Sequence, residues 1–389
     1  MHSRRSEFAF ALIAAVIVFQ IACPVVIASS GAHLSRGTFA TSSDASRYRA
    51  IAEAPGTPYR DFDVEYPPAA LGLFHVLGPR HFDAFRLRLL ALQVACQALI
   101  VGLLFLVWNR RAAWSYLVLS TPMLFVVYTS YDLVGVALAV TGAALVRRRH
   151  PVAGAIGLVI GAFTKVWPAV LVPGLLVPPR RLRAFVTAVA VGGAGLLGWI
   201  AWGGPGAIGQ VVAYRGARGW QYESVPGSLF RLVTRDALRF EGGAWRLGAP
   251  PRVLSILISV GAIAAVAGIW WLAVRGGGVT VGVPETAAIT AVLVFATLCS
   301  AHFLIWPLPF VAIAAAAGAR RLERWAGAVA LLTFLDWLLY NPSHPASGPL
   351  EVAIVARNVA LVGLLVAAVA ALRPQPSNRR QKVGSQRTL

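Results

Sequence analysis

The 389-residue chain has little charge for its length. Charged residues make up 13% of it and hydrophobic residues 58%, with a mean hydropathy of +0.69. An average soluble protein carries about 25% charged residues. A soluble globule with so few charges would expose large apolar patches and aggregate. The same composition excludes a disordered chain, a collagen-like chain and a small disulfide scaffold, which leaves a helical protein with several membrane spans.

Lysine and cysteine are scarce as well. Lys165 and Lys382 are the only lysines, so arginine carries almost all of the net charge of +20. We attribute the arginine excess mostly to codon bias in a GC-rich genome. Cys23, Cys96 and Cys299 all lie in apolar stretches, so we expect packing residues and no disulfide framework. The sequence contains no HExxH, P-loop or GxSxG motif and no His/Cys cluster typical of zinc, so we expect no cofactor, and no metal is indicated.

Long apolar runs dominate the sequence. A spanning helix needs about 20 mostly apolar residues, because lipid satisfies no backbone hydrogen bonds. The first run, 8–28, is longer than the core of a secretory signal, so we interpret it as a retained helix. The sequence predicts an all-α, polytopic transmembrane bundle of about twelve spans, at 8–28, 85–108, 113–128, 131–146, 152–164, 166–178, 184–202, 252–274, 285–299, 303–318, 326–340 and 351–372.

The basic residues predict the orientation of this bundle, because cytoplasmic loops of membrane proteins are rich in Lys and Arg. With a cytoplasmic N-terminus, 19 of the 35 basic residues lie in short cytoplasmic segments. The prediction is a single membrane domain over 1–372 in the cell membrane, with both termini cytoplasmic and a disordered tail over 373–389. Because the basic runs serve orientation, we expect no nucleic-acid partner.

Two long hydrophilic segments, about 29–84 and 203–251, then lie on the outer side. In the first, Ala45–Ala54 can form a short helix with Asp44 at or near its N-cap. One interpretation is that Asp44 only caps this helix, where a carboxylate accepts backbone N–H groups. The other is that Asp44 is a general base held ionised at the membrane surface. The sequence leaves both open.

Two further patterns occur in these outer segments. Asp61 and Asp63 have the spacing of a two-carboxylate metal clamp, but such triplets are common by chance, so we favour two solvated loop acids. From Ser228 to Phe240 apolar residues recur near helical spacing, which predicts an interfacial amphipathic helix. Its simplest role is anchoring to lipid headgroups.

Ionisable residues within or near the spans form a pattern of their own. A charge at the centre of a spanning helix costs about 2.5–3.5 kcal/mol on insertion scales, so such residues usually have a role. Taken singly, Glu285, Asp336 and Arg357 are explained as snorkelling or paired structural residues and His302 as a hydrogen-bonded structural residue, whereas Lys165, with no acid partner nearby in sequence, fits that explanation less well. The predicted topology, however, gathers most of them in the leaflet that adjoins both outer segments. They are Asp132, Lys165, Glu285, His302, Asp336 and Arg357.

Cations at membrane depth beneath a rim of carboxylates suit one kind of substrate. A polyprenyl-phosphate sugar places its phosphate at the headgroup level and its sugar in water. Cations would hold the phosphate, and a carboxylate would deprotonate the hydroxyl that accepts the sugar.

Several motifs resemble the GT-C superfamily of membrane glycosyltransferases, and more narrowly the bacterial glycosyltransferase family 87. An acid ahead of a short Tyr-containing helix, followed by 56–62 (GTPYRDF) and 65–68 (EYPP), resembles its first outer loop. Residues 161–168 (GAFTKVWP) resemble its Lys-aromatic-Pro element, and residues 218–224 (RGWQYES) its Arg-Gly-x-Gln-x-Glu-Ser element. Residues 300–309 (SAHFLIWPLP) resemble its Ser-Pro-Gln-Tyr-x-x-Trp-x-x-Pro element, from which Ala301 and His302 depart.

This resemblance implies an inverting transfer of a sugar, often mannose, from a polyprenyl-phosphate donor to a glycolipid or cell-envelope glycan acceptor on the outer face. The catalytic acid of the family maps to Asp44. By position, the candidates for supporting the acceptor and the active site are Asp61, Asp63, Glu65, Glu223 and His302. The candidates for binding the donor phosphate are Lys165, Arg215 and Arg218.

Two other functions stay open at this stage. A transporter or lipid flippase would use Asp132, Lys165 and Asp336 along a translocation path. A non-catalytic scaffold of envelope assembly would tolerate neutralisation of the acids in the outer segments.

Overall fold

The structure is a computed structural model of the chain. It describes residues 2–29, 44–78, 81–179, 181–217, 219–235, 237–241, 244–248, 250–276, 279–340 and 347–372. The side chains of 2–13 and 213–217 lie outside the described part. The fold is mostly helical, as the composition predicts, with one two-stranded sheet among the described residues.

In the described part of the chain, four helices are long and apolar enough to cross a membrane. They are α5 (Phe82–Leu103) with its continuation through Trp108, α10 (Leu182–Gly203), α13 (Arg252–Arg275) and α17 (Gly348–Ala371). The other helices are α1 (His2–Ser29), α3 (Asp44–Glu53), α4 (Pro68–Val76), α6 (Arg110–Ser120), α7 (Leu124–Val127), α8 (Asp132–Arg147), α9 (Pro151–Thr164), α11 (Ala207–Ala217), α12 (Val225–Thr234), α14 (Val283–Phe295), α15 (Leu308–Ala316) and α16 (Arg320–Leu339).

Proline residues break three of the apolar runs. Pro122 lies in a short 3₁₀ turn between α6 and α7, and Pro307 separates the 3₁₀ turn Ala301–Ile305 from α15. The run after Lys165 contains Pro168 and Pro173 and forms a 3₁₀ helix over Trp167–Leu176. Proline lacks the N–H that an α-helix interior needs. These breaks place 3₁₀ backbone instead of α-helix next to Lys165 and at His302.

Helices that follow one another in the chain lie side by side, as in α8 with α9 and α16 with α17. At the α8–α9 contact, a Cβ on Gly154 would lie 2.6 Å from the carbonyl oxygen of Gly142. Small residues thus let the two backbones approach closely, as is common between membrane helices. Because α8 ends in a short turn before α9, the first residue of α8 and the residue after α9 lie at the same end of the pair.

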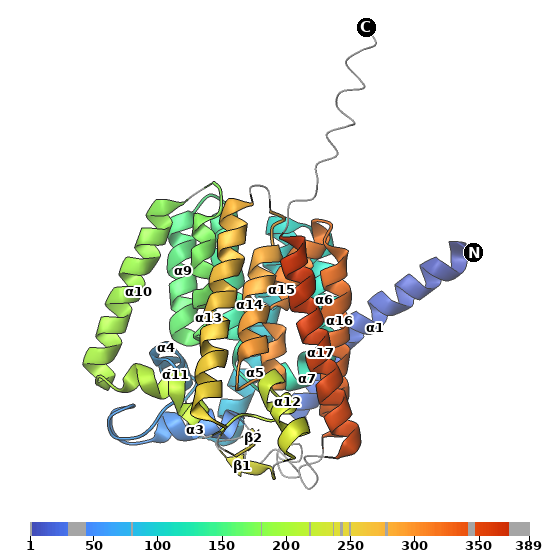
Figure 1. Ribbon diagram of the computed structural model, residues 1–389. Helices are drawn as coiled ribbons and strands as arrows, with labels where there is room; N and C mark the ends of the chain where they lie inside the picture. The colour runs from blue at the N-terminus through green and yellow to red at the C-terminus, as the bar shows by residue number, and fades with distance from the viewer. Residues whose placement is uncertain are drawn as a thin grey trace.

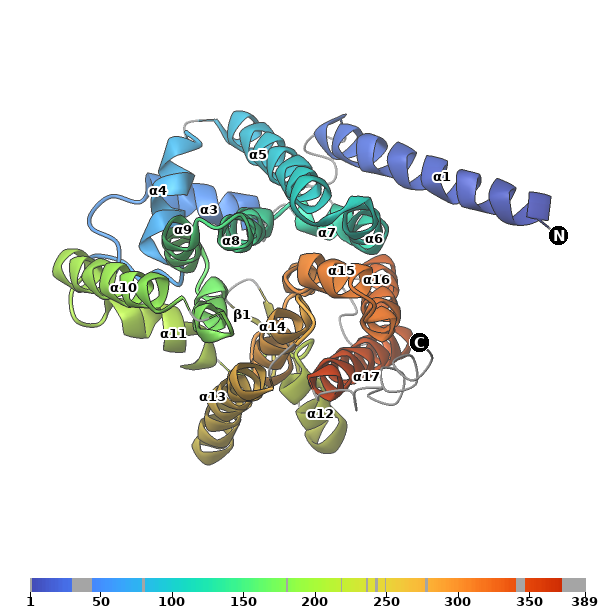
Figure 2. The same ribbon diagram turned by 90° about the horizontal axis from the view of Figure 1, so that it is seen from above.

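One end of the bundle carries the short elements. Figure 1 shows α3, α11, α12 and the β1–β2 hairpin at the end opposite the last residues of α17, and Figure 2 shows α1 diverging from the other helices. The two predicted outer segments therefore lie together at one end of the molecule.

The predicted amphipathic helix over 228–240 is only partly right. Helix α12 begins earlier, at Val225, because Ser224 caps it by accepting from the backbone N–H of Gly227 at 3.0 Å. It ends at Thr234, and Arg235 has a left-handed backbone (φ +53°). Strand β1 (Arg239–Glu241) then pairs antiparallel with β2 (Ala244–Arg246). Phe240 faces Trp245 in this register, so an aromatic cross-strand pair replaces the predicted last helical turn.

Candidate functional site

A cavity of about 690 Å³ is lined by residues of α3 and of the β1–β2 hairpin, among others. These two elements lie at the end of the bundle that carries the short elements (Figure 1). Both predicted outer segments and the adjoining helix ends line the cavity. Five residues predicted from the sequence share this lining, namely Asp44, Glu65, Lys165, Glu223 and His302. The cavity therefore brings together residues that are up to 258 positions apart, from Asp44 to His302.

Asp44 is the first residue of α3, and its side chain is 30% exposed. Tyr48, one turn later, fixes the helix because it is buried, stacks on Phe74 with ring centroids 4.5 Å apart, and meets Tyr66 and Tyr131 edge to face. This aromatic cluster holds the N-terminal end of α3, and with it Asp44, against the cavity.

Lys165 and Asp132 form a buried ion pair. The Lys165 Nζ lies 3.0 Å from each carboxylate oxygen of Asp132, which begins α8 and is fully buried. Trp306 donates its indole N–H to the same carboxylate at 2.6 Å. The ammonium group also lies 4.2 Å from the centroid of the Tyr131 ring and 4.8 Å from that of Phe303. The cation predicted at Lys165 is thus held by one carboxylate and surrounded by aromatic rings.

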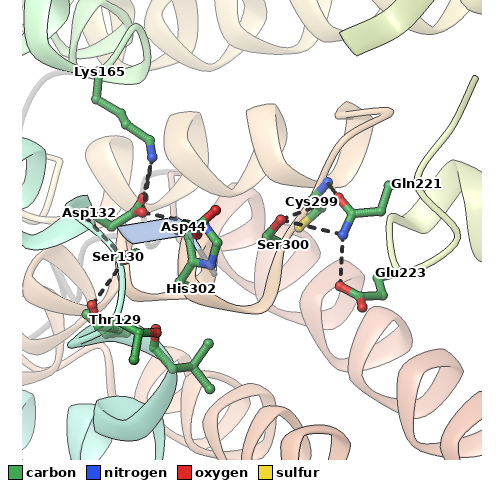
Figure 3. A network of polar contacts seen from close by, with 12 residues as sticks. Asp44, Thr129, Ser130, Asp132, Lys165, Gln221, Glu223, Cys299, Ser300 and His302 are labelled. Atoms are coloured by element: carbon green, nitrogen blue, oxygen red, sulfur yellow. Dashed lines mark hydrogen bonds and ion pairs between the residues drawn. The ribbon is translucent and has the colours of Figure 1, made fainter. Parts of the chain in front are cut away.

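His302 lies between the two carboxylates (Figure 3). Its Nε2 is 3.7 Å from an Asp44 oxygen and 3.5 Å from an Asp132 oxygen, at ion-pair distance from both. A nitrogen lone pair facing two carboxylates would be repelled, so this geometry favours a proton on Nε2. His302 therefore connects Asp44 electrostatically to the Lys165–Asp132 pair.

A second polar group lies in the same cavity around Gln221 and Glu223. Gln221 donates its amide N–H to Glu223 at 2.9 Å and accepts from the backbone N–H of Cys299 at 3.1 Å. Burial, followed by the nearby Asp336 carboxylate, raises the pKa of Glu223 to about 7. The backbone carbonyl of Glu223 accepts from Arg357 and Asn358, so its main chain is fixed from α17.

The other predicted residues lie elsewhere. Glu65 lines the cavity but forms a buried ion pair with Arg47. Asp61 accepts the backbone N–H of Thr57 in a local turn, and both Asp61 and Asp63 are exposed and absent from the cavity lining.

For the predicted donor-binding arginines, the structure gives no contacts. Arg218 lies outside the described residues, and for Arg215 only the backbone is described. No group of three side chains suited to a metal ion occurs in the described part of the chain.

The sequence indicated Asp132 as a membrane-depth acid and as part of a translocation path in a transporter, and Trp306 as part of a motif. The pairing of Asp132 with Lys165 needs residues 33 positions apart to meet, and no local pattern indicates it. Asp336 and Arg357 do form a buried ion pair, which confirms their interpretation as paired structural residues.

No protein-family model matches the chain, and none of the curated proteins matches it.

Proposed function

We propose that the protein is a membrane glycosyltransferase that moves a sugar from a polyprenyl-phosphate donor to a glycolipid or cell-envelope glycan. The observation that carries the proposal is the single cavity that holds Asp44, His302 and Lys165 beside each other. Such a cavity provides a partly exposed carboxylate next to the largely buried Lys165 and His302, in a bundle that contains membrane-length helices.

The proposed reaction uses Asp44 as the general base. Asp44 takes the proton from an acceptor hydroxyl while that oxygen attacks the anomeric carbon of the donor sugar. The bond between that carbon and the phosphate oxygen breaks, and the phosphate leaves with the bonding electron pair, so the anomeric configuration is inverted. The cationic side chains in the cavity stabilise the negative charge on the departing phosphate.

Lys165, Arg215 and Arg218 remain our candidates for contact with the donor phosphate. The charge of Lys165 is compensated by Asp132. A phosphate that approaches Lys165 therefore competes with Asp132, and the two arginines would supply the remaining positive charge. Asp61 and Asp63 are proposed only as acceptor contacts at the rim, since neither lines the cavity.

The proposed topology follows from charge. About twelve apolar segments would cross the cell membrane, with both termini cytoplasmic and the cavity open to the outer face. The helix ends opposite the cavity carry arginine clusters such as Arg147–Arg149 and Arg320–Arg321. This arrangement supports the orientation because cytoplasmic positive charge sets the orientation of membrane proteins.

The test is transfer of labelled mannose from polyprenyl-phosphate mannose to membrane acceptors by the purified protein. Replacing Asp44→Asn removes the base and keeps the shape, so the rate is expected to fall by about 10²–10⁴-fold. The matched control is Glu53→Gln on the same helix, because Glu53 pairs with Arg49 and does not line the cavity. Transfer by Asp44→Asn at the parent rate would overturn the proposal.

A further inference from the structure

The second polar group of the cavity, around Gln221 and Glu223, includes polar atoms that can contact a ligand. Glu223 lines the cavity, and its Oε2 accepts from Gln221. No hydrogen bond within the described part of the chain ends on the other carboxyl oxygen, Oε1. Ser300 also lines the cavity, and its hydroxyl makes long contacts, of 3.4 and 3.5 Å, with the Gln221 amide. Glu223 and Ser300 can therefore both bind a ligand.

The position of these groups is firmly set. The Gln221 backbone N–H donates to the carbonyl of Thr297 at 2.9 Å, and its side-chain oxygen accepts from Cys299. Gln221 thus joins the 219–224 segment to the 297–300 segment through both its main chain and its side chain. A polar group fixed in this way needs little ordering when a ligand binds, which favours affinity.

Aromatic side chains lie beside this group. Trp245 and Tyr340 line the cavity and are joined by a hydrogen bond from the indole N–H to the phenol oxygen at 3.0 Å. The backbone N–H of Tyr222, next to Gln221, donates to the carbonyl of Trp245 at 3.1 Å. An amphipathic surface therefore adjoins a carboxyl and a hydroxyl group.

The chemistry of this group favours a neutral, hydroxyl-rich ligand. Among the described residues, the cation that contacts this group, Arg357, is committed to Asp336 and to the carbonyl of Glu223. The described charged groups that adjoin it, Glu223 and Asp336, are acids, which would repel a phosphate. A sugar ring presents hydroxyl edges to polar groups and a C–H face to aromatic rings, so it fits both parts of this surface.

The two polar groups of the cavity are also close together. Ser300 belongs to one and His302 to the other, and two residues of chain span at most about 7 Å. Figure 3 shows Ser300 and His302 in this order between Gln221 and the Asp44–Asp132 pair. A sugar bound at Ser300 and Glu223 would therefore lie next to Asp44, which His302 faces.

We propose that Gln221, Glu223 and Ser300, together with Trp245 and Tyr340, form the subsite that binds the accepting saccharide. This inference deepens the proposed transferase function. It rests on that function for the assignment of the bound saccharide as the acceptor. Glu223 binds sugar hydroxyl groups through Oε1, Ser300 binds a neighbouring hydroxyl, and the aromatic pair contacts the ring face. The raised pKa of Glu223 supports this role, because a carboxyl group that is partly protonated near neutral pH both donates and accepts hydrogen bonds.

The test measures binding separately from transfer. Methyl α-mannoside, methyl β-glucoside and methyl β-galactoside are each added to the full-length protein in lipid nanodiscs, and binding is followed by saturation-transfer NMR. At least one of the three glycosides is expected to bind. Replacing Glu223→Ala should weaken that binding about tenfold or more, which is the loss expected for a charge-assisted hydrogen bond. Trp245→Ala should also weaken it, as a second variant that leaves the polar groups in place.

Two control variants separate this subsite from the rest of the site. Asp44→Asn is expected to bind the glycoside like the parent while losing transfer. Glu351→Ala removes a carboxylate that pairs with Arg231 outside the cavity and should leave binding unchanged. Inorganic phosphate is expected not to displace the glycoside.

The subsite assignment is overturned if none of the three glycosides binds the parent, if Glu223→Ala and Trp245→Ala both bind like the parent, or if phosphate competes. Transfer is assayed in parallel, so the two proposals can fail separately. Glycoside binding that depends on Glu223, in a protein without transferase activity, would keep the subsite and refute the transferase. Transfer by Glu223→Ala with an unchanged KM for the acceptor would keep the transferase and refute the subsite.

Discussion

A single buried carboxylate, Asp132, joins parts of the chain that are far apart in sequence. It accepts hydrogen bonds from Lys165 and from Trp306, and it faces His302. The carboxylate has no exposure to solvent, so its charge depends on partners within the protein, and in the described part of the chain these are Lys165, Trp306 and His302. The shape of the cavity wall around Lys165 therefore depends on one ionised side chain at the start of α8.

Replacing Asp132→Asn is expected to destabilise the protein by about 3 kcal/mol, because Lys165 would keep its charge in a buried position without a counter-ion. The readout is the apparent melting temperature in detergent. The matched control is Glu351→Gln, which breaks the part-exposed pair with Arg231 and should change stability by less than about 1 kcal/mol. Adding Lys165→Met to Asp132→Asn should recover part of the loss. Equal melting temperatures for Asp132→Asn and the parent would contradict a structural role for the pair.

The contribution of Glu223 to folding stability depends on pH with the opposite sign to that of an ordinary ion-paired carboxylate. Its pKa is raised from 4.5 to about 7 in the folded protein, first by burial and then by Asp336. The folded state therefore holds this proton more tightly than the unfolded state, and the stability contribution is fully present below pH 4.5 and is lost as the pH rises to about 7. Glu223→Gln removes this loss, so the variant should melt higher than the parent at pH 8, and the difference should shrink toward pH 5. A difference in melting temperature between Glu223→Gln and the parent that is independent of pH would refute the raised pKa of Glu223.

At the scale of elements, the segment before α12 positions Gln221 and Glu223. Gly219 has a φ of +91°, and a Cβ there would lie 2.3 Å from the carbonyl oxygen of Leu247. The next residue, Trp220, accepts from the backbone N–H of Leu247 at 2.9 Å. The segment is thus held against β2 through a contact that only glycine allows.

Replacing Gly219→Ala should displace this segment and so impair both folding stability and binding of the acceptor. We expect a loss of at least about 1–3 kcal/mol, since the change combines a strained backbone with a clash against main chain. Gly209→Ala serves as the control, because Gly209 lies in α11 with open space around its Cβ position and should tolerate alanine. Similar melting temperatures for the two variants would show that the close contact at residue 219 is not required.

The helices and strands also show how much of the fold could be predicted from the sequence. The helical character and the positions of the long helices follow from apolar runs, as for the predicted span 85–108 and the observed Phe82–Trp108, whereas α4 and α11 lie in segments predicted only as hydrophilic. The short helix predicted over Ala45–Ala54 is confirmed as α3, which begins one residue earlier, at Asp44 itself. The β1–β2 hairpin was missed, because Arg239 to Arg246 lacks a clear alternation and the strands are stabilised by Trp245 packing against Tyr340, far away in sequence.

The candidate site was predictable as a set of residues and not as a set of contacts. Asp44, Lys165 and His302 were singled out by residue type and position. The contact of His302 with both Asp44 and Asp132 depends on how α3, α8 and the 3₁₀ turn at Ala301–Ile305 pack, which is long-range information. The exposed positions of Asp61 and Asp63, by contrast, agree with their interpretation from the sequence as two solvated loop acids.

At the scale of the whole molecule, the proposed chemistry requires the cavity to open on the outer face of the membrane. Exposed positions at the two ends of the bundle test this sidedness. Asp63 is exposed in the segment between α3 and α4, beside the cavity end, and His150 is exposed in the turn between α8 and α9 at the opposite end. The native Cys23, Cys96 and Cys299 are all buried, so they should contribute little background to labelling.

We expect Asp63→Cys to react with a membrane-impermeant maleimide on intact cells, and His150→Cys to react only after the membrane is permeabilised. The physical reason is the arginine-rich turn around His150, which favours the cytoplasmic side, whereas the acidic segment around Asp63 is free to cross. The parent protein, labelled in parallel, measures the background. The reverse pattern would place the cavity on the cytoplasmic face, where the proposed outer-leaflet donor could not reach Asp44. Labelling of both positions on intact cells would refute a fixed barrier between the two ends of the bundle.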